Sequence, residues 1–222
     1  MDVELITIGD ELLLGFTVDT NAAHLARELA SIGIAIRRRV TVGDVGEDIA
    51  AAVRDAIERT GAVVTTGGLG PTSDDLTKPS IAALFGRGMR LDEEHVAWME
   101  ERWLQRFRRR MPESNRAQAM LPEGATKLVN RHGSAPGIWL EDEQGRWVAM
   151  LPGVPREMKG MLADTLLPIL RERAAAAGGA TVVRSLTLRT TGVAESLLAD
   201  QIDPIKERLG PVSLAYLPGP DG

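Results

Sequence analysis

Apolar and polar positions follow one another along the first part of the chain in the order strand, helix, strand, helix, strand. Apolar runs rich in β-branched residues predict strands at residues 3–8, 34–42 and 62–66. Between them, apolar residues recur every three or four positions, which predicts helices over residues 21–31 and 47–60. The connections are short, as is typical of a parallel sheet with right-handed crossovers.

The stretch up to residue 176 continues with less regular spacing. Pro168 lies inside the last predicted helix, and because proline has no N–H to donate, we expect it to kink or divide that helix. The predicted helices cover residues 78–85, 92–109, 114–120 and 156–176, and the predicted strands cover residues 127–130, 137–140 and 147–151.

A run of alanine and glycine predicts a domain boundary, with one domain at residues 1–174 and a second at 179–222. The second is expected to hold a strand at residues 181–190, a helix at 192–202 and a strand at 213–216. The chain ends in a turn-like Gly-Pro-Asp-Gly without a returning strand, so we expect only part of a small α+β module.

Residues 67–77 read GGLGPTSDDLT and are called the glycine turn below. They connect the buried strand at 62–66 to a helix that we expect Thr77 to cap. Glycines let backbone N–H groups approach a ligand closely, and the start of a helix favours phosphate. The adjacent carboxylates of Asp74 and Asp75 suit such a site if a divalent cation bridges them to phosphate oxygens. The alternative is an ordinary strand-to-helix turn with capping aspartates.

Two other loops follow predicted parallel strands, Gly9-Asp10-Glu11 and Gly43-Asp44. Ligands of such sheets bind beyond the carboxyl ends of the strands, so we expect these loops to meet the glycine turn in one cleft. Asn21 begins the next helix and is placed to cap it. It is therefore a candidate ligand contact with a sufficient structural explanation.

The bulk composition narrows the classes of function. The chain has 222 residues, 44% of them hydrophobic and 26% charged, with a net charge of -5, which is typical of a globular protein and argues against one that mainly grips nucleic acid. The absence of cysteine excludes thiol catalysis and disulfides, and the three histidines have no metal-ligand spacing. No secretory signal or apolar run of about 20 residues is present, so we expect a cytoplasmic protein without a membrane partner.

Several motifs together resemble the N-terminal part of the CinA family, the competence/damage-inducible proteins. They are IGDELLLG (8–15), DTN (19–21), TTGGLGPTSDDLT (65–77), NRAQAMLP (115–122), GSAPGIW (133–139) and LPGVPREM (151–158). This resemblance implies an α/β three-layer sandwich with a mostly parallel sheet, the molybdenum-cofactor-biosynthesis fold shared with MogA and MoaB, which bind molybdopterin. RTTGVAES (189–196) resembles the KH-like module that follows in the family, although it lacks a Gly-x-x-Gly clamp for nucleic acid.

The resemblance also implies an activity, the hydrolysis of ADP-ribose or a related nucleotide diphosphate to two monophosphates with a divalent metal, Mg or Co. The alternative is a molybdopterin- or nucleotide-binding module without turnover. The molybdopterin-binding relatives carry Arg before the aspartate of the glycine motif, where this chain has Asp74; Asp75 and Thr77 match. The exchange favours a metal-rich site. We do not assign the deamidase activity of the family's C-terminal domain, and we expect a homo-oligomer, either dimer or trimer.

The candidate site residues follow from these arguments. Asp44 and Asp75 are the candidate catalytic residues, and Asp74 and Asp75 are the candidate metal ligands. For Asp44, the simpler interpretation is an aspartate that only closes a turn. The candidate contacts to a nucleotide diphosphate or pterin phosphate lie in the predicted loops or in the family motifs; they are Asp10, Glu11, Asn21, Gly67, Gly68, Gly70, Thr77, Ser134 and Glu157.

Overall fold

The computed structural model describes residues 1–176 and 186–217. The chain divides into two compact units, Met1–Val183 and Arg184–Gly222, which are described separately. Residues 177–179 of the predicted domain boundary lie outside the described residues, so the boundary stays a prediction.

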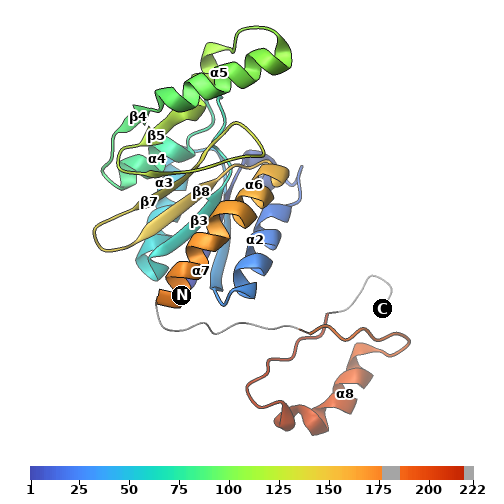
Figure 1. Cartoon of the computed structure of the whole chain (residues 1–222). Helices are drawn as coiled ribbons and strands as arrows, with labels where there is room; N and C mark the ends of the chain where they lie inside the picture. The colour runs from blue at the N-terminus through green and yellow to red at the C-terminus, as the bar shows by residue number, and fades with distance from the viewer. Residues whose placement is uncertain (177–185, 218–222) are drawn as a thin grey trace. The chain divides into compact units, whose positions relative to one another are not determined.

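A six-stranded sheet forms the centre of the first unit, in the order β2-β1-β3-β8-β7-β6 (Figure 1). β2, β1, β3 and β8 are parallel, and β7 and β6 continue the sheet in antiparallel fashion. This confirms the predicted mostly parallel α/β sheet. The strand bounds are β1 Asp2–Ile8, β2 Ala35–Val42, β3 Ala62–Thr66, β6 Thr126–Leu128, β7 Gly137–Glu141 and β8 Trp147–Leu151.

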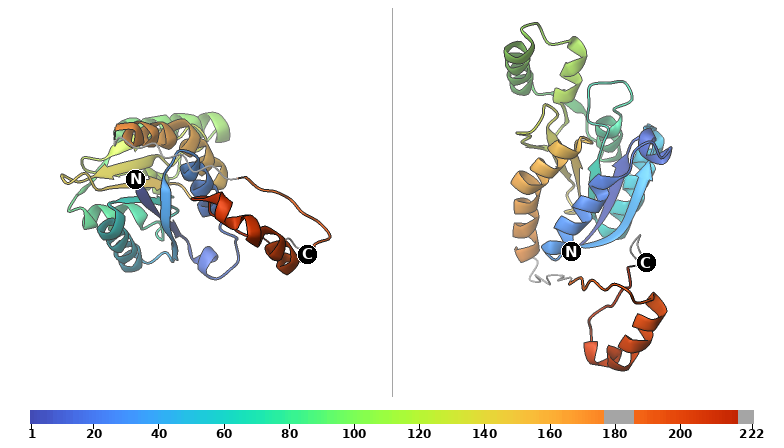
Figure 2. Two further views of the ribbon diagram at one scale, coloured as in Figure 1. Left: turned by 90° about the horizontal axis from the view of Figure 1, so that it is seen from below. Right: turned by 90° about the vertical axis from the view of Figure 1, so that its right-hand side faces the viewer.

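Helices cover both faces of this sheet, which gives the three layers visible in Figure 2. One layer holds α2 (Thr20–Ser31), α6 (Pro155–Met161) and α7 (Leu167–Ala176), and the other holds α3 (Gly46–Thr60) and α4 (Thr77–Leu84). In the described part of the chain, no helix is long and apolar enough to cross a membrane.

The central strands read as continuous apolar runs because both of their faces are buried. On β1, Val3 and Leu5 pack against α2 and α6, while Ile6 and Ile8 pack against α3. Glu4 lies among these apolar residues and is almost fully buried. It accepts two hydrogen bonds from the Arg59 guanidinium, at 2.7 and 2.8 Å, so the buried carboxylate is paired.

Pro168 divides its helix as predicted. The five residues Leu162–Leu166 (η2) form a π-helical turn between α6 and α7. Proline cannot donate to the carbonyl four residues earlier, and a π turn is one way in which a helix adapts to that missing bond.

The sequence reasoning missed the shortest elements. β4 (Met89–Leu91) and β5 (Met120–Pro122) form a separate two-stranded sheet, and α1 (Asp10–Leu13) is a single turn. These are too short for a periodic pattern. The residues predicted as a helix at 114–120 form the 3₁₀ helix η1 (Glu113–Ala119) instead. The helix predicted at 92–109 is confirmed as α5 (Glu93–Phe107), which extends from the body of the unit (Figure 1).

The second unit differs from its prediction. Its helix α8 runs over Glu195–Lys206, later than expected, followed by the 3₁₀ turn η3 (Glu207–Leu209). The predicted strand at 213–216 is wrong, and residues 186–190 of the other predicted strand are also not a strand, while 181–185 lie outside the described residues. An alternating pattern forms a strand only with a neighbour to pair with, and no paired strand occurs among residues 186–217. The KH-like module therefore stays a prediction.

Truncating the core side of β1 tests this architecture. Leu5→Ala should lower the free energy of unfolding by about 2–5 kcal/mol, because it removes a buried side chain and leaves a cavity. Urea denaturation followed by circular dichroism measures the change. The matched control is Leu14→Ala, where the side chain is 67% exposed and the change should stay within about 0.5 kcal/mol. Equal effects at the two positions would contradict the assigned packing.

Candidate functional site

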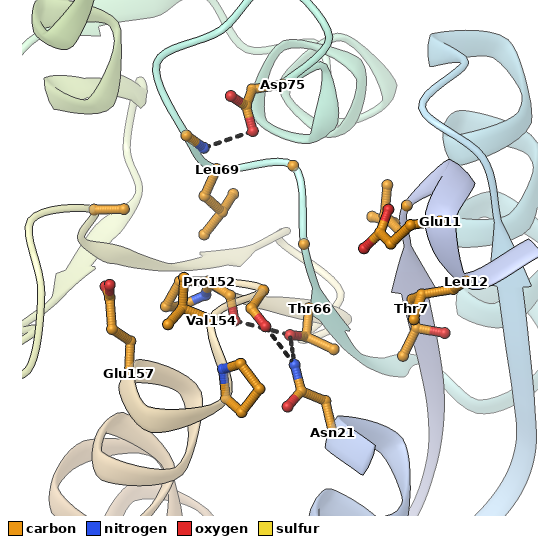
Figure 3. A pocket seen from close by; sticks show the side chains of 18 of the residues that line it. Thr7, Glu11, Leu12, Asn21, Thr66, Leu69, Asp75, Pro152, Val154 and Glu157 are labelled. Atoms are coloured by element: carbon orange, nitrogen blue, oxygen red, sulfur yellow. Dashed lines mark hydrogen bonds between the residues drawn. The ribbon is translucent and has the colours of Figure 1, made fainter. Parts of the chain in front are cut away.

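A cleft of about 560 Å³ lies at the carboxyl ends of β1, β3 and β8. Its walls come from the loops that follow these strands, together with residues of η1 and of the loop before β7. In the view of Figure 3, Glu11 and Glu157 lie on opposite sides, with Leu69 of the glycine turn between them. The expected meeting of the sheet-end loops is therefore observed.

Most of the candidate residues line this cleft, and two do not. Asp10 and Thr77 are absent from the lining. The candidates that line it are Glu11, Asn21, Asp44, Gly67, Gly68, Gly70, Asp74, Asp75, Ser134 and Glu157. The lining residues that sequence reasoning did not select include Thr7, Thr66, Leu69, Gln118, Ala135 and Gly153.

The glycine turn depends on backbone conformations that only glycine adopts easily. Gly67 has φ +113° and Gly68 has φ +64°. A Cβ atom on Gly67 would collide with the carbonyl of Ile8, and one on Gly68 with the hydroxyl of Thr77. The chain can therefore pass close to β1 and α4 only with glycine at these two positions.

Thr77 does not cap α4, so that prediction is wrong. It is the first helical residue, and the preceding Leu76 occupies the cap position without a side-chain bond. The fully buried Thr77 hydroxyl instead donates to the carbonyl of Gly67 at 3.0 Å. Thr77 thus shapes the glycine turn from behind rather than contacting the cleft.

Asp75 closes the glycine turn with both carboxylate oxygens. Oδ1 accepts from Gly70 N at 2.7 Å, and Oδ2 accepts from Thr72 N at 2.8 Å and Thr72 Oγ1 at 2.6 Å. These donors lie in the turn and not in α4, so Asp75 is not a helix cap. Its neighbour Asp74 is exposed and lines the cleft.

Asp10 and Asp44 hold the first two sheet-end loops together. Asp10 N donates to Asp44 Oδ2 at 3.0 Å, and Asp44 N donates to Asp10 Oδ1 at 3.2 Å. The Asp10 carboxylate therefore satisfies a neighbouring loop amide. Asp44, in contrast, also lines the cleft.

The electrostatic surroundings of Asp44 are unfavourable for its charge. Burial raises the pKa of the Asp44 carboxyl above its ordinary value, and the hydrogen bond from Asp10 only partly opposes this. Repulsion from the carboxylates of Asp10, Glu11 and Asp74 raises the pKa further.

The described residues of the cleft do not form a complete metal site made of side chains. No group of three or more His, Asp or Glu side chains within residues 1–176 and 186–217 is arranged to hold a metal ion.

Asn21 is not the cap of α2, which corrects the sequence interpretation. Asp19 takes that role and accepts from Ala22 N at 2.8 Å. Both residue types favour cap positions, so the sequence could not separate them. The Asn21 amide instead donates to Gly153 O at 2.7 Å and Thr66 Oγ1 at 3.3 Å, linking α2 to the ends of β3 and β8.

Asn130 fixes the side of the cleft that carries Glu157, opposite Glu11 (Figure 3). Its amide donates to Glu157 Oε2 at 2.6 Å and to Ala135 O at 2.8 Å. The adjacent Ser134 carbonyl is contacted at 2.9 Å by His95 Nε2, so this histidine has a structural contact and not a metal-binding one. Ser134 and Glu157 are thereby placed in the cleft by a connected set of hydrogen bonds.

Sequence reasoning also passed over Lys78, which does not line the cleft but holds Gln118, which does. Lys78 is only 3% exposed, and its Nζ donates to Ala117 O at 2.6 Å and Gln118 O at 3.2 Å. Burial lowers the pKa of Lys78 to about 8, against the opposing attraction of Asp75. A lysine after Thr77 reads as a surface residue in the sequence, so its burial gave no signal.

Comparison with known proteins identifies the family. The family described as "Probable molybdopterin binding domain" matches residues 4–172. The protein CinA of Thermoplasma acidophilum, described as having unknown function, is 35% identical with a TM-score of 0.69, over 76% of this chain and 97% of that one. The chain belongs to the CinA family. This confirms the resemblance seen in the motifs.

Other relatives agree with this assignment. The CinA-like protein of Gemmatimonas aurantiaca is 65% identical over 222 residues, all of this chain but 51% of the relative, and that of Salinibacter ruber is 41% identical over 223 residues, again all of this chain and 53% of the relative. This CinA-family chain thus spans about half the length of these curated relatives. MoaB of Thermus thermophilus, at 19% identity and TM-score 0.53 over 80% of this chain and 97% of its own, shows the shared fold.

The buried ammonium predicts a pH-dependent stability. The pKa of Lys78 is about 8 in the folded chain against 10.5 for a free lysine, so the unfolded chain binds more protons between these values and stability rises with pH there. From pH 7.5 to 10, the wild type should gain roughly 2 kcal/mol in free energy of unfolding relative to Lys78→Met. Urea denaturation across this range measures it. Lys159→Met, at an exposed lysine, should show no such trend, and parallel curves for both variants would refute the assignment.

Proposed function

We propose that the cleft binds a phosphate-bearing pterin or nucleotide. The observation that carries this proposal is the pair of neighbouring backbone N–H groups of Gly68 and Leu69, which take part in no hydrogen bond within the described residues. Both residues line the cleft in the loop between β3 and α4. Successive free amides in a loop form a concavity that binds anions such as phosphate.

The size of the cleft and the family description support the same ligand class. A volume of about 560 Å³ falls within the usual range for small-molecule sites. Two side chains hold the turn in its open form, since Thr77 fixes Gly67 while Asp75 fixes Gly70. The free amides are therefore prepared before a ligand arrives.

The first experiment tests phosphate recognition by the turn. Isothermal titration should show that ADP-ribose and molybdopterin bind while adenosine, which lacks phosphate, binds far more weakly. Gly68→Ala should weaken binding of the phosphate ligands by about 10- to 100-fold, because the added Cβ would collide with the Thr77 hydroxyl and move the free amides away from the phosphate. The matched control is Gly145→Ala, which also places alanine at a positive φ, of +77°, but outside the cleft lining. Equal losses in the two variants would count against the proposal.

A second candidate function is metal-dependent hydrolysis of a nucleotide diphosphate, such as ADP-ribose, to two monophosphates. The charge of the cleft favours it. Six carboxylates line the cleft and no lysine or arginine does; they belong to Glu11, Asp19, Asp44, Asp74, Asp75 and Glu157. Such a cleft repels a bare phosphate, so a cation is expected to accompany the ligand.

The residues present fit a hard divalent cation such as Mg or Co. Asp44 and Asp74 are the side chains that would hold it, since the oxygens of Asp75 already accept bonds from the turn. Mg²⁺ commonly binds through one or two carboxylates together with substrate phosphates and needs no complete protein cage. A bound cation would offset phosphate charge and make a bound water more acidic.

The second experiment tests turnover. The protein is incubated with ADP-ribose and Mg²⁺ or Co²⁺, and AMP is measured by chromatography. Asp44→Asn should lower the rate by about 100-fold or more, because it removes a charge while keeping an oxygen for Asp10 N. Asp55→Asn, at an exposed aspartate outside the cleft lining, is the control. If ADP-ribose binds but no AMP forms with either metal, hydrolysis is refuted and only the binding function stands. Asp75→Ala is less informative because it also opens the glycine turn.

A further inference from the structure

One wall of the cleft has no role in phosphate or cation binding. It comes from η1, in the NRAQAMLP motif, and Gln118 is the residue of η1 that lines the cleft. The Gln118 residue is only 8% exposed, yet its Oε1 accepts no hydrogen bond from the described part of the chain. Buried amide oxygens normally have a partner, so an unpaired one in a cleft wall points to a donor on the ligand.

The position of Gln118 is set by Lys78. The Lys78 ammonium donates to the carbonyls of Ala117 and Gln118 and makes no ion pair among residues 1–176 and 186–217. It follows Thr77, whose hydroxyl holds Gly67. Two consecutive residues at the start of α4 therefore fix the glycine turn and the η1 wall relative to each other.

We propose that Gln118 contacts the ligand and that Lys78 is the positioning residue that holds it there. On binding, the Gln118 carboxamide turns toward the cleft, and its oxygen, which is covered in the free protein, accepts a hydrogen bond from an amino group on the ligand's heterocycle. This inference rests on the proposed ligand class, since adenine, guanine and pterin rings all carry such an amino group.

Other residues of the cleft lining suit a ring better than a phosphate. Leu69 and Ala135 contribute apolar surface to the lining, and Glu157 contributes a second acceptor. Acceptor oxygens repel phosphate but match the N–H groups at the edge of an amino-substituted ring. The free amides of the glycine turn remain available for the phosphate end of the same ligand.

The positioning role is tested without ligand. Hydrogen exchange at the amides of residues 117–121 should be about 10-fold faster in Lys78→Met than in the wild type, with exchange in β1 and β3 unchanged. Lys159→Met provides the same substitution at an exposed lysine and should exchange like the wild type. Unchanged exchange in η1 of Lys78→Met would overturn the positioning role, whatever the ligand is.

The contact is tested by pairing ligand and variant. Wild-type protein should bind ADP-ribose about 10-fold more tightly than its inosine analogue, which has a carbonyl in place of the amino group, and Gln118→Met should abolish this preference. Gln105→Met, at an exposed glutamine on α5, should retain it. GDP and molybdopterin, compared in the same two variants, distinguish the ring types. A preference unchanged in Gln118→Met would overturn the contact. If the wild type bound no phosphate ligand, the proposed function would fail and the contact with it, while hydrogen exchange would still decide the role of Lys78.

Discussion

Burial of the parallel strands on both faces is the constraint on which this structure depends. β1, β3 and β8 carry apolar side chains toward both helical layers, so both of their faces are closed to water. Each of these strands also pairs with a strand on either side, which satisfies its backbone groups. Polar side chains and free backbone groups that could bind a ligand can therefore lie only at the ends of the strands. The loops after β1, β3 and β8 meet at that edge, and the cleft forms between them because the sheet brings them there.

At that edge, many of the polar side chains build the loops rather than face a ligand. Asp75 closes the glycine turn, Thr77 holds it from behind, and Asn21 joins the ends of β3 and β8. Their consequence is a backbone held open at Gly68 and Leu69. The polar residues that the sequence marks as candidate ligand contacts thus mainly hold the loop backbone in place. Asp44 is the candidate that combines a hydrogen bond between loops with a charge that is unfavourable and lines the cleft.

The sequence could predict what periodicity and strand order determine. The parallel strands, the long helices and the shared cleft follow from such patterns, whereas β4 and β5 are too short to show one. The choice of Asp19 over Asn21 as the cap depends on a tertiary bond to Gly153. Burial of Lys78 depends on its contact with η1, about 40 residues later in the chain, and no pattern in the residues around Lys78 predicts that contact. The strand predicted at 213–216 has no partner strand in the described residues.

The charges of the cleft connect its two proposed functions. Free amides attract phosphate, yet the surrounding carboxylates repel it. Burial, together with repulsion from these carboxylates, also raises the pKa of Asp44. In the proposed function, a divalent cation carried by the ligand's phosphates would resolve both conflicts, because it would pair with Asp44 and Asp74 while the amides took the remaining oxygens. Ligand and cation would then bind as one unit, and neither would need a complete site of its own. Binding and hydrolysis in this cleft would accordingly share the same first step.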